Sequence, residues 1–219
     1  MSAHTGRRRG RWIVLLSACM VLVVAGGLTA LTGMNTAQRS SVTVEKDMNG
    51  HDVALDPGVE LAPQDTVTTD TGQRFRVPSV GLDVDLKTIT PTDGQVTPPG
   101  FTSAYEIRSI GTTPSHPEAG TVYVVAHALR NGGTAPGNYL TDIRRQRSRL
   151  GPGTIVTVAG VDYAVTGARN VPKSVLAEDA ATWTNTPNRL VVITCLERAD
   201  GSPATHNTVI TATRALHVR

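Results

Sequence analysis

The chain of 219 residues is poor in cysteine, in charge and in aromatic side chains: it has two cysteines, 18% charged residues and 4% aromatic residues. This charged fraction excludes a disordered polyanion or a histone-like tail. Glycine and proline are spread without a period, which excludes collagen and low-complexity sequence. The spacings Cys-x-x-Cys and His-x-x-x-His are both absent, so the sequence offers no tight set of zinc ligands, and we expect neither a metal nor a cofactor.

Positive charge is concentrated at the N-terminus. Arg7, Arg8, Arg9 and Arg11 lie within the first eleven residues, and removing their four charges from the formal net charge of +3 leaves −1 for the rest of the chain. A nucleic-acid-binding protein needs a basic face on its folded part. We therefore expect no nucleic-acid partner.

Residues 12–31 form an apolar run without a single charge. A helix of this length spans about 30 Å, the thickness of the hydrocarbon core of a bilayer. We predict one transmembrane helix, with the basic residues holding the tail 1–11 in the cytoplasm and the rest of the chain outside the cell. A cleaved secretory signal is the main alternative, and a lipoprotein signal at Cys19 or twin-arginine export are weaker ones.

The remainder divides into a linker and a folded domain. Residues 32–73 are polar and irregular, as expected of an extracellular stalk. Residues 74–219 are numerous enough for one core and carry many short β-branched runs between glycines and prolines. We expect an all-β domain, a closed barrel rather than a sandwich. The expected strands are 74–80, 84–90, 120–126, 154–159, 161–167, 189–194 and 208–213, with short helices at 139–147 and 175–183.

Cys195 is the one cysteine outside the apolar run, so the predicted domain offers it no disulfide partner. An unpaired thiol outside the cell calls for an explanation. Cys195 follows the strand pattern of residues 189–194 and precedes a loop, a place where a rigid scaffold presents reactive groups. It is a candidate nucleophile, and the alternative is a small buried hydrophobic residue.

His127 is the candidate base, because it likewise ends a Val-rich strand pattern and precedes a loop. A thiol needs a neighbouring base or cation to become a thiolate, and an imidazole can later protonate the leaving amine. Four other histidines are interpreted as solvated, and His206 stays a minor candidate; the four are His4, His51, His116 and His217.

The order of His127 and Cys195, each at the end of a strand pattern, resembles that of the sortases, the cysteine transpeptidases of Gram-positive surfaces. The sequence Val191-Val-Ile-Thr-Cys195 keeps the Thr-Cys end of the family signature Thr-Leu-x-Thr-Cys and places apolar residues before it. The resemblance covers 74–219. Residues 76–84 resemble the first barrel strand of the family, and the segments 98–100, 120–127 and 171–173 are similar to the actinobacterial class E and F sortases.

The resemblance implies an eight-stranded barrel in which Cys195 attacks an LPXTG-like sorting signal and His127 is the acid and base. The partners would be a sorting-signal peptide and an amine of a peptidoglycan precursor or pilin. The family also uses an arginine at the start of the strand after the cysteine loop, where this chain has Thr205-His206-Asn207. Arg198, His206 and Arg214 are candidates to replace it.

The absent arginine leaves two other hypotheses open. One is a catalytically silent sortase-fold binding module at the cell surface. The other is an ordinary anchored β domain whose cysteine is simply buried.

Overall fold

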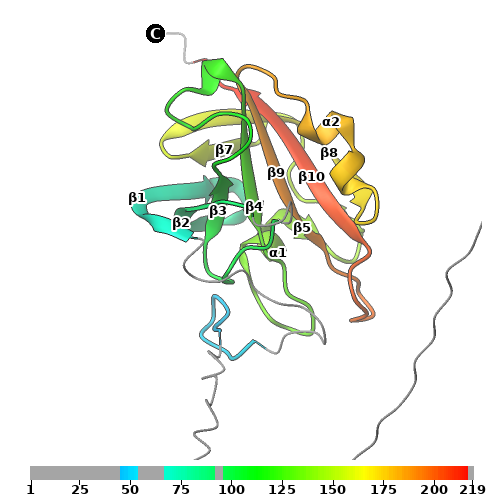
Figure 1. Ribbon diagram of the computed structural model, residues 1–219. Coiled ribbons are helices and arrows are strands. Elements are labelled where there is room, and N and C mark those ends of the chain that lie inside the picture. Colours follow the sequence, from blue (N-terminus) through cyan, green and yellow to red (C-terminus); the bar gives the residue numbers. More distant parts are fainter. Residues whose placement is uncertain (1–44, 54–66, 92–95, 217–219) are drawn as a thin grey trace, which may run out of the picture. The chain divides into compact units, whose positions relative to one another are not determined.

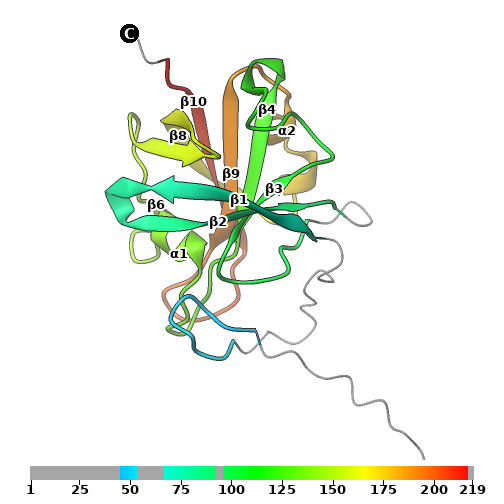
Figure 2. The same ribbon diagram turned by 90° about the vertical axis from the view of Figure 1, so that its left-hand side faces the viewer.

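The computed structural model describes residues 45–53, 67–91 and 96–216. Eight strands close into one barrel in the order β1-β2-β3-β4-β9-β10-β8-β7 (Figures 1 and 2). The barrel strands are β1 (Val67–Val77), β2 (Leu82–Ile89), β3 (Ala104–Ile107), β4 (Thr121–Ala126), β7 (Ile155–Val158), β8 (Val161–Pro172), β9 (Arg189–Leu196) and β10 (His206–Arg214). The expectation of an all-β, eight-stranded closed barrel is confirmed.

Two of the neighbouring pairs, β2 with β3 and β4 with β9, are parallel, and the others are antiparallel. Parallel neighbours need a long crossover connection, so the whole chain between 127 and 188 separates β4 from β9. This topology brings two strand ends that are distant in sequence to the same edge of the sheet.

Helices are few and short. The predicted helix at 139–147 is wrong: α1 (Pro136–Leu140) ends earlier, and β5 (Thr141–Asp142) and β6 (Arg147–Ser148) form a small hairpin after it. Gln146 in its turn adopts a φ of 50°, which no helix allows. The region 175–183 contains a 3-10 turn at Leu176–Glu178 and α2 (Ala180–Trp183). Further 3-10 turns lie at Pro78–Val80 and Pro117–Ala119.

Side-chain alternation along the strands divides the apolar residues between two clusters. Val124, Val192 and Ile210 belong to the cluster that fills the barrel. Their neighbours Val125, Ile193 and Val209 belong to a second cluster. Because successive side chains of a strand point to opposite faces, this second cluster lies on the outer face of β4, β9 and β10.

The N-terminal part of the described chain packs against the barrel: Met48 lies against the core cluster, and its backbone N–H donates to the Thr134 carbonyl at 2.8 Å. Asp47 is 3% exposed, and its carboxylate accepts the backbone N–H groups of Asn49, His51 and Thr134 at 2.8, 2.9 and 3.0 Å. Arg74, the predicted first residue of the barrel domain, lies inside β1. Within the described ranges no helix is long and apolar enough to cross a membrane, and the predicted span at 12–31 lies outside them.

Candidate active site

His127 and Cys195 lie next to each other at the end of two neighbouring parallel strands. Ala126 of β4 is in register with Thr194 of β9. His127 follows Ala126 and Cys195 follows Thr194, so these two residues are also side by side. Neighbouring strands are about 4.8 Å apart. Alternation from Val125 and Ile193 places both side chains on the outer face, and both line the same cleft.

The His127 ring is held by contacts from the segment before β3. Its Nε2 is 2.8 Å from the carbonyl oxygen of Pro98, and its ring centre is 4.7 Å from that of Phe101. A carbonyl can only accept a hydrogen bond, so Nε2 carries the proton and Nδ1 keeps its lone pair in the neutral ring. Burial lowers the pKa of His127, and the charge of Lys173 lowers it further, against the opposing effect of the Pro98 carbonyl.

Cys195 is a free, half-buried thiol. Burial raises its pKa, and the nearby carboxylate of Glu197 raises it too. Lys173 acts in the opposite direction, since its positive charge lowers the pKa of Cys195. Taken together, these shifts make the neutral thiol beside a neutral imidazole the dominant resting state, with the thiolate as a minor form.

Lys173 follows β8, and sequence reasoning assigned it no role. Its backbone N–H donates to the carbonyl of Thr205 at 2.9 Å, which extends the pairing of β8 with β10 by one residue. Val171 belongs to the outer cluster, so alternation places Lys173 on the outer face as well. The signal that could have revealed it is this alternation along the end of β8.

The loop after His127 is fixed to α1 by a single amide side chain. Asn138 accepts the N–H of Leu129 at 2.9 Å and that of Ala135 at 2.8 Å, and it donates to the Leu129 carbonyl at 2.7 Å. The loop also reaches the segment after Cys195, because Arg130 Nη1 donates to the carbonyl of Gly201 at 2.6 Å. Both catalytic candidates are therefore followed by loops that hold each other in place.

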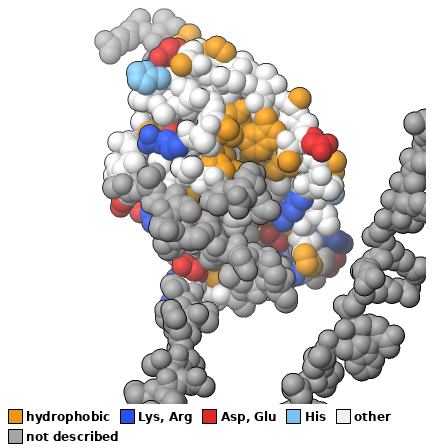
Figure 3. Space-filling model, viewed as in Figure 1, with side chains coloured by type: hydrophobic (Ala, Val, Ile, Leu, Met, Phe, Trp, Pro, Cys, Tyr) orange, Lys and Arg blue, Asp and Glu red, His pale blue; other side chains and the backbone are white. Residues whose placement is uncertain are grey.

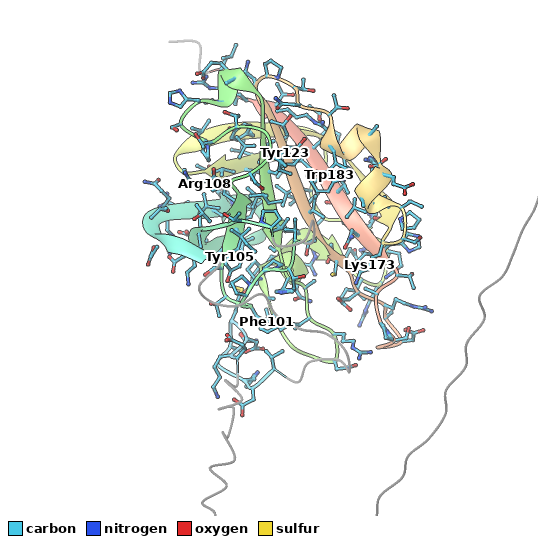
Figure 4. The ribbon with its side chains drawn as sticks, viewed as in Figure 1. Phe101, Tyr105, Arg108, Tyr123, Lys173 and Trp183 are labelled. Atoms are coloured by element: carbon cyan, nitrogen blue, oxygen red, sulfur yellow. The ribbon has the colours of Figure 1, made fainter. Side chains whose placement is uncertain are left out.

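A cleft of about 1450 Å³ runs along the outer face from these residues. Its apolar wall includes Tyr123 and Trp183, whose ring centres are 5.4 Å apart, together with Ile193. The Trp183 indole N–H donates to the Leu176 carbonyl at 2.6 Å. Figure 3 shows hydrophobic side chains gathered on this face, and Figure 4, in the same view, labels Tyr123 and Trp183 there and Lys173 lower on the same side.

The three residues that the sequence offered as replacements for an arginine lie elsewhere. Arg198 is exposed and pairs with Asp200 at 3.1 Å. Arg214 ends β10 opposite Tyr163 and lies 3.9 Å from Glu118. His206 begins β10, and its ring is 3.0 Å from the Thr205 hydroxyl. None of the three is among the residues that line the cleft.

The residue opposite Cys195 on β10 is Asn207. It lines the cleft and lies on the outer face with Val209. Asn207 on β10, whose amide is uncharged, is therefore the neighbour of Cys195 on one side. On the other side the neighbour is His127, which follows β4.

No protein-family model and no curated protein matches the sequence. Solved structures that match include sortase A of Listeria monocytogenes, which is 16% identical with a TM-score of 0.48 over 68% of this chain and 89% of that chain. Sortase C-1 from Actinomyces oris is 16% identical with a TM-score of 0.46, covering 68% and 75%. Sortase C-1 from Streptococcus pneumoniae is 14% identical with a TM-score of 0.48, covering 68% and 69%. At these values the similarity says nothing about activity.

Proposed function

We propose that this chain is a sortase-type cysteine transpeptidase, similar to the class E and F enzymes. The observation that carries the proposal is the adjacency of His127 and Cys195 on one face of the parallel pair β4 and β9, at the end of an open apolar cleft. A nucleophile and a base that neighbouring strands present side by side form the minimal unit of thiol catalysis.

In the proposed reaction, His127 transfers the proton and Cys195 forms the covalent bond to the substrate. The Cys195 thiol gives its proton to His127, and the sulfur attacks a substrate carbonyl carbon. The tetrahedral intermediate then expels the amine of the scissile peptide bond, which takes the proton from the His127 imidazolium, and a thioester remains on Cys195. An acceptor amine attacks the thioester, loses a proton to His127, and releases the thiol with a new amide bond formed.

The protonation states limit how often this cycle begins. Since burial raises the pKa of Cys195 and lowers that of His127, the thiolate and imidazolium pair is a minor population near neutral pH. Burial, which causes these shifts, leaves His127 and Cys195 only partly exposed to water, and the less polar surroundings strengthen the charge interactions there.

The proposed substrate is an LPXTG-like sorting signal of secreted proteins, and the proposed acceptor is an amine of a peptidoglycan precursor or pilin. An extended peptide suits a cleft that follows the strands and is walled by aromatic side chains. We further propose that residues 12–31 anchor the chain in the cell membrane, with residues 1–11 in the cytoplasm and the barrel outside.

The test uses the full chain and an LPXTG-type peptide. We expect wild type and a Cys19→Ala control to form a thioester, detected as an added acyl mass on Cys195, and to transfer the acyl group to an added amine. Cys195→Ala should do neither. Turnover by Cys195→Ala would contradict the proposal, and peptide binding by wild type without any thioester would favour a silent binding module.

A further inference from the structure

The site lacks an obvious partner for negative charge. Attack by the thiolate creates negative charge first on the Cys195 sulfur and then on the carbonyl oxygen of the substrate, and enzymes stabilise such charge with donors already in position. The resemblance implies an arginine for this task, yet Arg198 and Arg214 point to Asp200 and Glu118 rather than to the cleft. Asn207 is adjacent to Cys195 but carries no charge.

Two cations, Arg130 and Lys173, line the cleft, and Lys173 is the one that follows a barrel strand close to Cys195. It leaves β8 two residues beyond Val171, and Val171 is in register with Asn207, which is in register with Cys195. A lysine side chain is long and flexible enough to reach diagonally across one strand. Its side chain lines the same cleft as the thiol, and Figure 4 shows Lys173 on that side of the sheet.

The charged groups around the thiol are few. Glu197 follows β9 and is 6% exposed, His127 follows β4, and Lys173 follows β8. The charge of Lys173 acts on all three titratable neighbours: it lowers the pKa of Cys195, of His127 and of Glu197. Arg130 also lines the cleft, but its charge acts on Glu197 and not on Cys195 or His127, and its Nη1 donates to the Gly201 carbonyl. Lys173 is therefore the cation best placed to hold a thiolate.

We propose that Lys173 is a catalytic residue that stabilises the Cys195 thiolate and then the oxyanion of the substrate, in place of the family's arginine. An ammonium group has three donors, so it can donate one hydrogen bond to sulfur and direct another to the carbonyl oxygen. It keeps its own proton throughout, and proton transfer remains with His127. The second half of this role rests on the proposed transpeptidase function.

The experiment uses iodoacetamide as a probe of Cys195 in the full chain, so that the reactivity of the thiol is measured without the peptide substrate. The variants are Lys173→Gln, Lys173→Arg and, as a matched control for loss of a neighbouring cation, Arg198→Gln. We expect Lys173→Gln to shift the pH profile of alkylation upward by about one unit or more. The profile of Lys173→Arg should stay near wild type, and that of Arg198→Gln should not move.

Transfer of an LPXTG-type peptide is measured in the same variants. We expect kcat/KM to fall about 100-fold or more in Lys173→Gln, the loss typical of removing one oxyanion donor, and to recover largely in Lys173→Arg. Lys173 is exposed, so the variants should melt like wild type.

Each outcome bears on one of the two proposals. An unchanged alkylation profile in Lys173→Gln overturns the role of Lys173, whether or not wild type transfers peptide. A shifted profile supports the role at the thiolate, and wild type that forms no thioester then contradicts the transpeptidase alone. A shifted profile with unchanged transfer overturns the role at the oxyanion.

Discussion

The backbone N–H of Gly137 donates to the carbonyl of His127 at 2.8 Å. This contact is possible because Gly137 has no side chain: a Cβ atom there would lie 1.9 Å from Thr194 Oγ1 and 2.7 Å from the His127 carbonyl oxygen. The first turn of α1 therefore packs directly on His127 and on Thr194, the residue before Cys195. A side chain at 137 must displace one of them.

We predict that Gly137→Ala destabilises the protein by about 1–3 kcal/mol, the usual cost of overpacking a filled site. The displacement should also slow the alkylation of Cys195, since Thr194 is the residue before it. Thermal unfolding and iodoacetamide kinetics measure the two effects. Gly151→Ala is the matched control, because a Cβ at Gly151 meets nothing within 4 Å; equal effects of the two substitutions would contradict the packing argument.

Glu197 acts on the nucleophile through its charge. It raises the pKa of Cys195, and burial raises its own pKa. We predict that Glu197→Gln lowers the pKa of Cys195 and speeds alkylation at neutral pH, the opposite of the change expected for Lys173→Gln. The pH profile of alkylation tests this. An upward shift would show that Glu197 holds Lys173 in position more than it repels the thiolate.

Trp183 forms part of the apolar wall of the cleft, away from the reacting atoms. Its indole is fixed by the bond to the Leu176 carbonyl and by the Tyr123 ring. We predict that Trp183→Ala weakens binding of the sorting peptide about tenfold or more, as for an aromatic anchor of an interface, and leaves the alkylation of Cys195 unchanged. Ile155→Ala on β7 is the control, because Ile155 is 39% exposed and lies outside the cleft lining. A loss of peptide binding in this control would argue against a local effect.

The half-buried His127 makes folding stability depend on pH. Its pKa is lowered in the folded state from 6.5, so the unfolded chain binds the proton more strongly and stability falls as pH decreases. The loss begins near pH 6.5 and grows until the lowered pKa of the folded state is reached. The raised pKa values of Glu106 and Glu197 contribute in the opposite sense above pH 4.5.

The variant His127→Gln isolates this effect, since glutamine does not titrate and its amide can donate to the Pro98 carbonyl. We expect wild type to lose more stability than His127→Gln between pH 7 and pH 5, measured by denaturant unfolding at each pH. Parallel curves for the two proteins would mean that the His127 pKa is not lowered by folding.

Local sequence patterns were sufficient to predict the class of the fold, and they singled out His127 and Cys195, whose catalytic role stays a prediction. The alternating β-branched runs predicted strands, and the turn at Ala159-Gly160, with φ values of 50° and 81°, joins two of them, the predicted strands 154–159 and 161–167. Cys195 and His127 were found because each ends an apolar strand pattern before a loop. The helix at 139–147 failed because its apolar spacing was weak and tertiary contacts to β8 and Glu197 hold that segment as a hairpin.

The sequence by itself determined that a cysteine and a histidine end two buried strands, because strand periodicity and loop composition are local properties. Only the tertiary structure decided that these strands are parallel neighbours in register, that Arg198 and Arg214 face other partners, and that Lys173 lines the same cleft as the thiol. Strand order and register depend on long-range pairing around a closed barrel, which no short segment of sequence encodes. Lys173 follows β8, which is two strands away from β9 and its cysteine, so its place at the site depends on the strand order of the sheet.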